Sequence, residues 1–169
     1  YKIGNNLIRD SSPQGVLTLQ QILKKSSNIC AAKIGMSIPP SQFYDYIMLF
    51  GFGQKPNSGI VAEASGRVIS PNKWKSIDHA TISFGQAILV SPLQMVSAAN
   101  VFANHGEWIQ PHILDHVRDK KGKIIKEIKD NDGSLVQKFG SVIRNQVVES
   151  SVSELIKEYL ISVTQPGGT

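Results

Sequence analysis

The chain has 169 residues, of which 41% are hydrophobic and 18% are charged, and this composition excludes an intrinsically disordered segment. The length is enough for one domain with its own core, and no run approaches the about 20 apolar residues that span a bilayer. The net charge of +5 does not indicate nucleic-acid binding, because the lysine cluster holds no interleaved aromatic residue and is interpreted as solvated surface. That cluster consists of Lys120, Lys121, Lys123 and Lys126.

The first third of the chain is predicted to hold one strand and then two helices. Residues 1–9 alternate loosely as a strand does, and a turn cluster follows at residues 10–13. Apolar residues at helical spacing predict a helix over residues 15–27, with Thr18 as its N-cap. A second helix is predicted over residues 29–36, because two prolines follow and stop it.

The middle of the chain is predicted to hold two more helices around a long loop. The third helix should start near Ser41, a candidate N-cap, and end at the glycines that follow residue 50. Residues 51–79 carry turn residues at high density and are predicted to be irregular. Ser91-Pro92 then opens a helix, with the proline at its first position, and Asn104-His105-Gly106 ends it.

The last third is predicted to contain a hairpin and a final helix. Ile113 to Ile128 alternates as a hairpin whose turn is Asp119-Lys120-Lys121-Gly122. Apolar residues at helical spacing predict a helix from about Gln146 to Ser162. A mostly helical chain with a hairpin predicts the α+β class.

Neither the cysteine nor the histidines indicate a metal or cofactor site. The single cysteine, Cys30, permits no internal disulfide and lies among apolar residues, which favours packing over chemistry. The four histidines show no ligand spacing with acids or cysteine, and a strand-like alternation separates His112 from His116. The chain begins at Tyr1 and ends on Gly-Gly-Thr, and we expect it to be part of a longer protein.

Ser26-Ser27-Asn28 lies between the first two predicted helices and allows two interpretations. Side chains two residues apart lie on the same side of an extended or turning backbone. The Ser26 hydroxyl can then pass a proton, and the Asn28 amide can hold a peptide group. Alternatively, a Ser or Asn before Ile29 caps the next helix by accepting from its free N–H groups. The tripeptide is too short to decide between catalysis and capping.

Two further patterns that resemble catalytic motifs are interpreted as structural. Ser70-Pro71-Asn72-Lys73 matches a Ser-x-x-Lys nucleophile motif, which needs Ser and Lys one helical turn apart. The match falls in the irregular region, without a buried helix around it, so we interpret it as accidental. Glu63 is a lone acid in the same region and a weak candidate for a general base.

Residues 80–95 carry the most informative pattern, Ala-Thr-Ile-Ser-Phe-Gly-Gln-Ala-Ile-Leu-Val-Ser-Pro-Leu-Gln-Met. This run resembles the core of the penicillin-binding transpeptidases of the monofunctional class B, and of the division type more than the elongation type. Ser26-Ser27-Asn28 then resembles the second active-site motif of that family, Ser-x-Asn. Ala87 departs from the family, which often has Gly there, and we infer no loss of activity from it.

The resemblance implies an architecture in which this chain is incomplete. The family fold is a five-stranded antiparallel sheet with helices on both faces, shared with serine β-lactamases. Residues 1–169 would form the helical part and a β-hairpin of one transpeptidase domain, and we expect this part not to fold stably alone. The nucleophile motif would precede Tyr1, and the Lys-Thr-Gly strand would follow Thr169.

The resemblance also implies a function and a location. It implies a peptidoglycan D,D-transpeptidase that acts through a serine acyl-enzyme, with stem peptides as substrates and β-lactams as inhibitors. Ser26 and Asn28 would be catalytic, and Asn28 would also bind the substrate amide. The domain would lie outside the cytoplasmic membrane, held by an upstream anchor, with other cell-wall or division proteins as partners. The alternatives are a β-lactamase or β-lactam sensor of the same fold, and a non-catalytic division scaffold.

Overall fold

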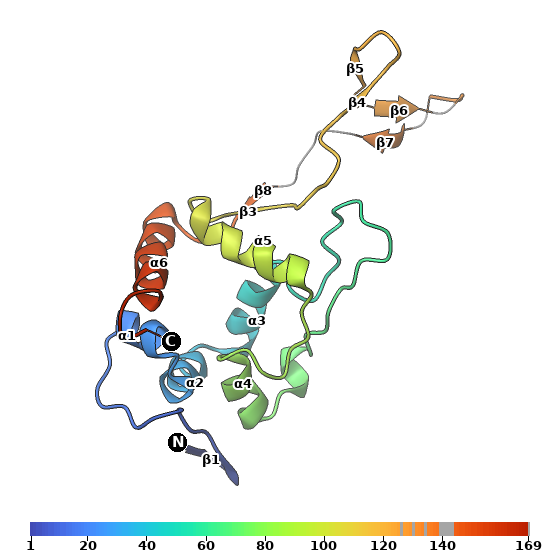
Figure 1. Cartoon of the computed structure of the whole chain (residues 1–169). Helices are drawn as coiled ribbons and strands as arrows, with labels where there is room; N and C mark the ends of the chain where they lie inside the picture. Colours follow the sequence, from blue (N-terminus) through green and yellow to red (C-terminus); the bar gives the residue numbers. More distant parts are fainter. Residues whose placement is uncertain (126, 130, 134, 139–143, 169) are drawn as a thin grey trace.

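The helices of the computed structural model follow one another in an order close to the predicted one. The structure describes every residue except 126, 130, 134, 139–143 and 169. The helices and a 3-10 turn are α1 (Leu19–Lys25), α2 (Asn28–Met36), α3 (Pro40–Leu49), η1 (Pro71–Lys73), α4 (Ser76–Ile82), α5 (Pro92–Ala103) and α6 (Ser150–Val163). Together they form a helical body from which a hairpin arm projects (Figure 1).

The strands are short, and each described sheet is a single antiparallel pair. They are β1 (Lys2–Ile3), β2 (Asn6–Leu7), β3 (Glu107–Ile109), β4 (Val117–Arg118), β5 (Ile124–Ile125), β6 (Glu127–Lys129), β7 (Leu135–Lys138) and β8 (Arg144–Gln146). β1 pairs with β2, β3 with β8, β4 with β5 and β6 with β7. The α+β class is therefore confirmed, with helices forming the larger part.

Two helix starts lie where their capping residues predict them. The Thr18 hydroxyl accepts from the backbone N–H of Gln21 at 3.3 Å, and the Gln21 side chain accepts from the Thr18 N–H at 2.9 Å. Ser91 and Gln94 make the same reciprocal pair at the start of α5, with Pro92 at the first helical position. Each pair satisfies N–H groups that a helix start leaves free.

Several predicted boundaries are wrong. Ser41 is not an N-cap, because α3 already begins at Pro40, whose missing N–H suits a first turn. Residues 51–79 are not irregular throughout, since η1 and the start of α4 lie within them. The last helix begins at Ser150, because residues 144–146 extend as β8 and pair with β3. β3 and β8 escaped prediction because a partner distant in sequence, and not local alternation, defines them. The strand predicted over residues 1–9 is instead a local antiparallel pair of two short strands, β1 and β2.

Small residues let α2 and α4 approach closely. A Cβ atom on Gly35 of α2 would lie 1.8 Å from the Ser83 hydroxyl at the end of α4, so only glycine fits there. Beside this contact, Ala32 and Ala80 are fully buried and form a small core cluster with Ile8 from the N-terminal segment. The sequence thus anchors the helix that follows Ser-Ser-Asn to two other parts of the body.

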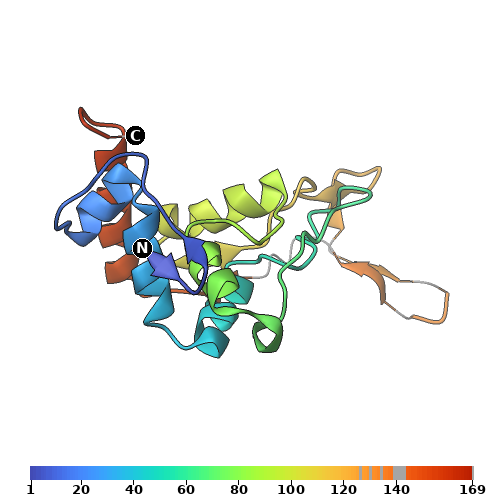
Figure 2. The same cartoon turned by 90° about the horizontal axis from the view of Figure 1, so that it is seen from below.

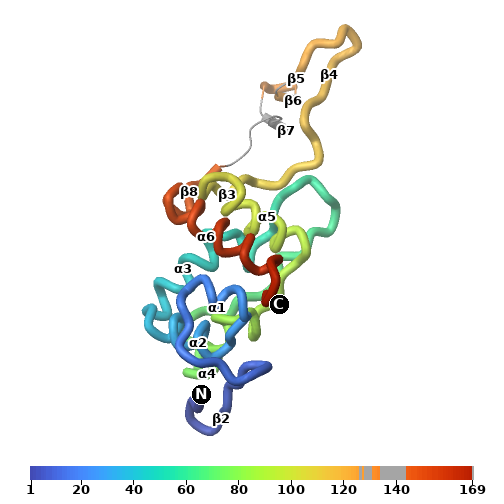
Figure 3. Tube along the Cα trace, turned by 60° about the vertical axis from the view of Figure 1, so that its left-hand side comes forward, coloured from blue at the N-terminus to red at the C-terminus, as the bar shows by residue number. Residues whose placement is uncertain are grey.

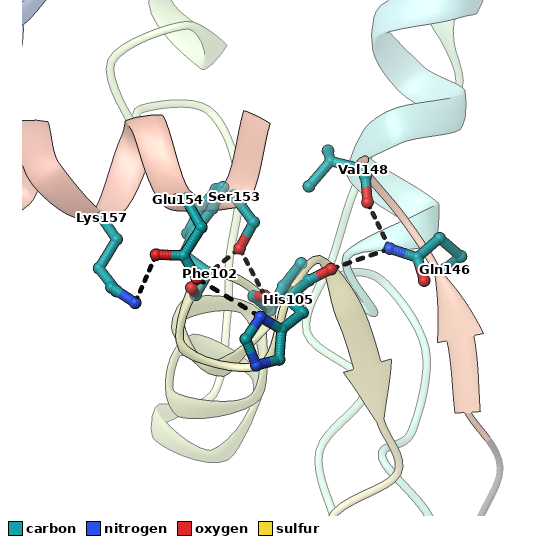
Figure 4. A network of polar contacts seen from close by, with 8 residues as sticks. Phe102, His105, Gln146, Val148, Ser153, Glu154 and Lys157 are labelled. Carbon is teal, nitrogen blue, oxygen red and sulfur yellow. Dashed lines mark hydrogen bonds and ion pairs between the residues drawn. The ribbon is translucent and has the colours of Figure 1, made fainter. Parts of the chain in front are cut away.

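A polar cluster joins the C-terminal end of α5 to α6 (Figure 4). The Ser153 hydroxyl, fully buried, donates to the Phe102 carbonyl at 2.9 Å. The Glu154 carboxylate forms an ion pair with the Lys157 ammonium at 2.7 Å and lies 3.4 Å from the Nδ1 atom of His105. The Lys157 hydrogen bond, with a smaller contribution from His105, lowers the pKa of the Glu154 carboxyl. The Ser153 hydrogen bond and the Glu154–His105 contact hold α6 against the end of α5, whereas the Lys157 ion pair lies within α6.

The arm carries β4 to β7 away from the helical body, and both chain ends lie on the far side of that body (Figures 1, 2 and 3). The predicted hairpin turn is confirmed, because the Asp119 carboxylate accepts from the N–H groups of Lys121 and Lys123 at its tip. Lys120, Lys121 and Lys123 are exposed there, which agrees with a solvated surface. Lys126, the fourth member of the cluster, lies outside the described residues.

Among the described residues, no helix combines the length and the apolar character needed to cross a membrane.

Candidate active site at the Ser26 turn

Ser26 lies at the end of α1 in a backbone conformation that favours glycine. Its φ and ψ angles are 50° and 47°, in the left-handed region. The Ser26 N–H donates to the Leu23 carbonyl and the Ser27 N–H to the Ile22 carbonyl, both at 3.1 Å, which is the Schellman pattern of a helix end. A non-glycine residue there is strained by about 1–2 kcal/mol. Strain of this kind is often retained where the side chain has a function.

Ser27, and not Ser26 or Asn28, caps the next helix. The Ser27 hydroxyl accepts from the Cys30 N–H at 3.1 Å, and its side chain is buried. The capping interpretation is therefore correct for the middle residue of the tripeptide alone. Ser26 is exposed, and its side chain does not cap α2.

Asn28 is the first residue of α2 and is half-buried. Its side-chain nitrogen donates to the Arg9 carbonyl at 3.2 Å. A side-chain amide offers one acceptor oxygen and a second N–H beyond this bond. Those two groups are what is needed to hold a peptide group of a substrate.

Asp10 contacts the residues on either side of Asn28. One carboxylate oxygen accepts from the Ser27 hydroxyl at 2.7 Å, and the other accepts from the Ile29 N–H at 3.0 Å. The sequence indicated only a turn at residues 10–13, because this contact joins residues 17 and 19 positions apart. Nothing in the local spacing of the chain predicts it.

The C-terminal segment also reaches the turn. The Lys25 ammonium donates to the Gly167 carbonyl at 2.8 Å, and α1 packs against α6. Residues at both ends of the chain therefore hold the Ser26 turn in place.

Gln94 lies in a second, buried polar centre between α5 and the loops that precede it. Its side chain is 1% exposed. The side-chain nitrogen donates to the Gln54 carbonyl at 2.8 Å and the Ser65 carbonyl at 2.9 Å, while the oxygen accepts from the Ser91 N–H at 2.8 Å. The glutamine of the Ser-Pro-Leu-Gln run is thus a structural residue that ties the long loop to α5.

The comparison with protein families decides the relationship. The family described as the penicillin-binding protein transpeptidase domain matches residues 2–169. The chain belongs to this family.

Relatives of the transpeptidase chain carry names that agree. It is 28% identical over 169 residues to a probable peptidoglycan D,D-transpeptidase, PenA, of Neisseria flavescens, covering 100% of this chain and 37% of that protein. It is 37% identical over 108 residues to the peptidoglycan D,D-transpeptidase FtsI of Escherichia coli K12, covering 64% of this chain and 18% of FtsI. The chain therefore spans well under half the length of these relatives.

A solved transpeptidase domain has the same fold. The domain of penicillin-binding protein 3 from Burkholderia pseudomallei, in its apo form, superposes with a TM-score of 0.75 and 30% identity. The match covers 95% of this chain and 43% of the solved one. The partial penicillin-binding fold expected from the sequence is thus confirmed.

In this fold, the Ser70–Lys73 pattern and Glu63 both lie in local turns and loops, which agrees with their interpretation as structural. Ser70 precedes a single 3-10 turn that ends at Lys73, and the Ser70 side chain makes no capping hydrogen bond. Glu63 accepts from the N–H groups of Asn57 at 2.7 Å and Ser58 at 2.6 Å, and from the Ser58 hydroxyl. The hydrogen bond from the Ser58 side chain is the main reason that the pKa of Glu63 is lowered. Glu63 therefore closes a loop.

Cys30 and Ala87 have backbone and packing explanations. Cys30 is half-buried on α2 behind its N-cap, so packing describes it better than chemistry. Ala87 has a φ of 62°, which explains why a glycine suits this position in the family. Among the described residues, no group of three or more His, Cys, Asp or Glu could hold a metal ion.

Proposed function

We propose that the protein to which this chain belongs is a peptidoglycan D,D-transpeptidase that crosslinks cell-wall stem peptides. The observation that carries the proposal is the family match over residues 2–169, supported by relatives named D,D-transpeptidases. The similarity to FtsI supports a role of the division type. β-Lactams would bind this protein, as the name of the family indicates, and we expect them to inhibit it by acylating its serine.

The reaction would proceed in two acyl-transfer steps. A serine outside this chain attacks the carbonyl carbon of the D-Ala-D-Ala peptide bond, forms an ester and releases D-alanine, whose nitrogen takes up a proton. An amine of a neighbouring stem peptide then attacks the ester, forms the new peptide bond and restores the serine hydroxyl. A β-lactam traps the first step, because its opened ring stays attached to the serine.

Ser26 and Asn28 are proposed to serve these steps. The exposed Ser26 hydroxyl would pass the proton to the departing amine, since a hydroxyl both donates and accepts. Its strained backbone supports this role, because glycine would fit the turn with less strain. Asn28 would hold a substrate amide with the oxygen and N–H that its bond to Arg9 leaves free.

Residues 1–169 are proposed to form part of one transpeptidase domain. An open apolar groove of about 420 Å³ supports this, because exposed apolar surface of this kind is normally covered. The groove lies between α1, α2 and α6 and is lined mainly by Leu19, Ile22, Leu23, Ile34, Leu155 and Ile156. A segment that precedes or follows this chain would cover it. A cooperative thermal transition in the isolated chain would contradict this part of the proposal.

The domain is proposed to act on the outer face of the cytoplasmic membrane, where peptidoglycan is crosslinked, with an anchor outside this chain. Other cell-wall or division proteins would be its partners. These statements rest on the transpeptidase assignment and fail if it fails.

The test is labelling of the full-length protein with a fluorescent penicillin. We expect stable labelling of the wild type, slower labelling of Ser26→Ala, and an unchanged rate for Ser41→Ala, an exposed serine on α3. Labelling that decays within minutes would indicate a β-lactamase instead. A folded protein that takes no label would contradict the enzyme proposal and favour a scaffold.

A further inference from the structure

Asp10 is the one acidic side chain that the structure places against the Ser-x-Asn turn, among the described residues. It lies in the segment that follows β2, and both of its carboxylate oxygens are used: one by the Ser27 hydroxyl, the other by the Ile29 N–H. The preceding residue, Arg9, accepts from the Asn28 side chain through its carbonyl. Two consecutive residues therefore contact all three residues 27–29.

The direction of these hydrogen bonds makes the contact specific. The Ser27 hydroxyl accepts from the Cys30 N–H, so its own proton is the group that must find an acceptor. The Asp10 carboxylate, which only accepts, is matched to that proton. A carboxylate is also favourable beside the N-terminus of α2, where the helix dipole is positive.

The consequence concerns the two residues on either side of Ser27. Ser26 keeps its strained conformation only while its surroundings hold the turn, and Ser27 is the next residue along the chain. Asn28 begins α2, and its neighbours 27 and 29 are both held by one carboxylate. The side chains proposed to act on substrate are thus placed through a group that does not itself touch it.

We propose that Asp10 is a positioning residue for Ser26 and Asn28, which it acts on through the Ser27 hydroxyl. This inference rests on the proposed acyl-transfer function and adds to it a residue that neither the family pattern nor the local sequence assigned to the site. A displacement of reacting groups by about 1 Å can cost up to 100-fold in rate.

The test is the rate of acylation by a fluorescent penicillin, measured on the full-length protein well below its melting temperature. Asp10→Asn keeps the shape and one acceptor oxygen, which can still accept from the Ile29 N–H, but presents N–H groups to Ser27. We expect acylation to slow by about 10- to 100-fold. Asp45→Asn is the matched control, because Asp45 is exposed on α3, and it should leave the rate unchanged.

A double-mutant cycle separates positioning from a general loss of structure. If Asp10 acts through Ser27, Asp10→Asn should slow acylation by less than about twofold in a Ser27→Ala background, because the hydrogen bond is already gone. Effects that multiply fully in the double variant would overturn the proposal. An Asp10→Asn protein that acylates at the wild-type rate would also overturn the proposal. This comparison can be made even if the Ser27→Ala protein does not fold. Absence of label on the wild type would instead overturn the proposed function, and this inference with it.

Discussion

The Ser26 turn and the Gln94 centre both lie in sequence patterns that resemble this family, and they differ in burial, hydrogen bonding and backbone conformation. Gln94 is 1% exposed, and its side chain is bonded to three different parts of the chain. Ser26 is exposed, its hydroxyl does not cap a helix, and its backbone is in a conformation that favours glycine. The buried Gln94 side chain has hydrogen-bond partners for both its nitrogen and its oxygen, whereas Ser26 keeps a backbone conformation that is unfavourable for a non-glycine residue.

This difference shows which part of a motif reports folding and which reports chemistry. The long run around Gln94 includes buried positions, Ala80, Ile82 and Gln94, whose surroundings restrict their residue types. The Ser-x-Asn tripeptide carries little information by itself, since three residues are too few to be specific. The structural run therefore identifies the family, and the strained turn carries the proposed chemistry.

The largest expected effect is on catalysis at Ser26. Ser26→Ala should slow acylation by penicillin by at least about 100-fold, because general acid–base groups contribute about 10²–10⁴ in rate. The melting temperature should stay within about 1–2 °C of the wild type, since an exposed side chain is lost. Stopped-flow acylation and thermal melting measure the two quantities. A Ser26→Ala protein that both acylates slowly and melts at a clearly lower temperature would remove the distinction between the two motifs.

Gln94→Leu should have the opposite signature. It removes the donor for the Gln54 and Ser65 carbonyls and the acceptor for the Ser91 N–H, so we expect a loss of about 3 kcal/mol in the free energy of unfolding. Chemical denaturation of the full-length protein measures it. The fraction that remains folded should acylate at close to the wild-type rate.

Gln86→Leu is the control for this variant, because Gln86 is an exposed glutamine in the same run. Its stability should change by less than about 0.5 kcal/mol. A Gln94→Leu protein as stable as Gln86→Leu would show that the buried centre does not support the fold.

The free energy of unfolding should depend on pH through His79, which lies in α4 where this helix packs on α2. This residue of α4 is buried beside Phe43 and Trp74, with ring centroids 5.7 and 5.5 Å away. Burial lowers the pKa of the His79 ring, and a hydrogen bond with the Gly35 backbone opposes this only in part. The ring is therefore neutral in the folded chain at a pH where an unfolded chain has begun to bind a proton.

The sign of the effect follows from that order of protonation. The unfolded chain takes up the proton near pH 6.5, the ordinary pKa of histidine, and the folded chain only at lower pH. The free energy of unfolding should thus fall as the pH drops from about 7 toward 5. Denaturation at several pH values should show a smaller fall in His79→Phe than in His112→Gln, which removes an exposed histidine. An identical fall in both variants would contradict a buried neutral His79.

The sequence predicted much of this because local rules govern the elements concerned. Thr18 and Ser91 start their helices through contacts three residues away, and the turn at Asp119 is closed by its own neighbours. The start of the last helix was wrong because β8 depends on a distant partner, β3. The same holds for the site: Ser26 and Asn28 stand in one tripeptide, whereas Asp10 reaches it only through the fold. The roles of Ser26 and Asn28 stay predictions until they are measured.

The most direct measurement compares Ser26→Gly with Ala87→Gly in stability and in acylation. Both residues have left-handed backbone angles, with φ of 50° and 62°, so glycine relieves strain at each position. We expect each variant to gain about 0.5–1 kcal/mol in the free energy of unfolding, because released strain exceeds the added chain entropy. Ser26→Gly should lose acylation by penicillin at least about 100-fold, while Ala87→Gly keeps the wild-type rate. A Ser26→Gly protein that is more stable and acylates normally would contradict the claim that the strained turn is kept for its hydroxyl.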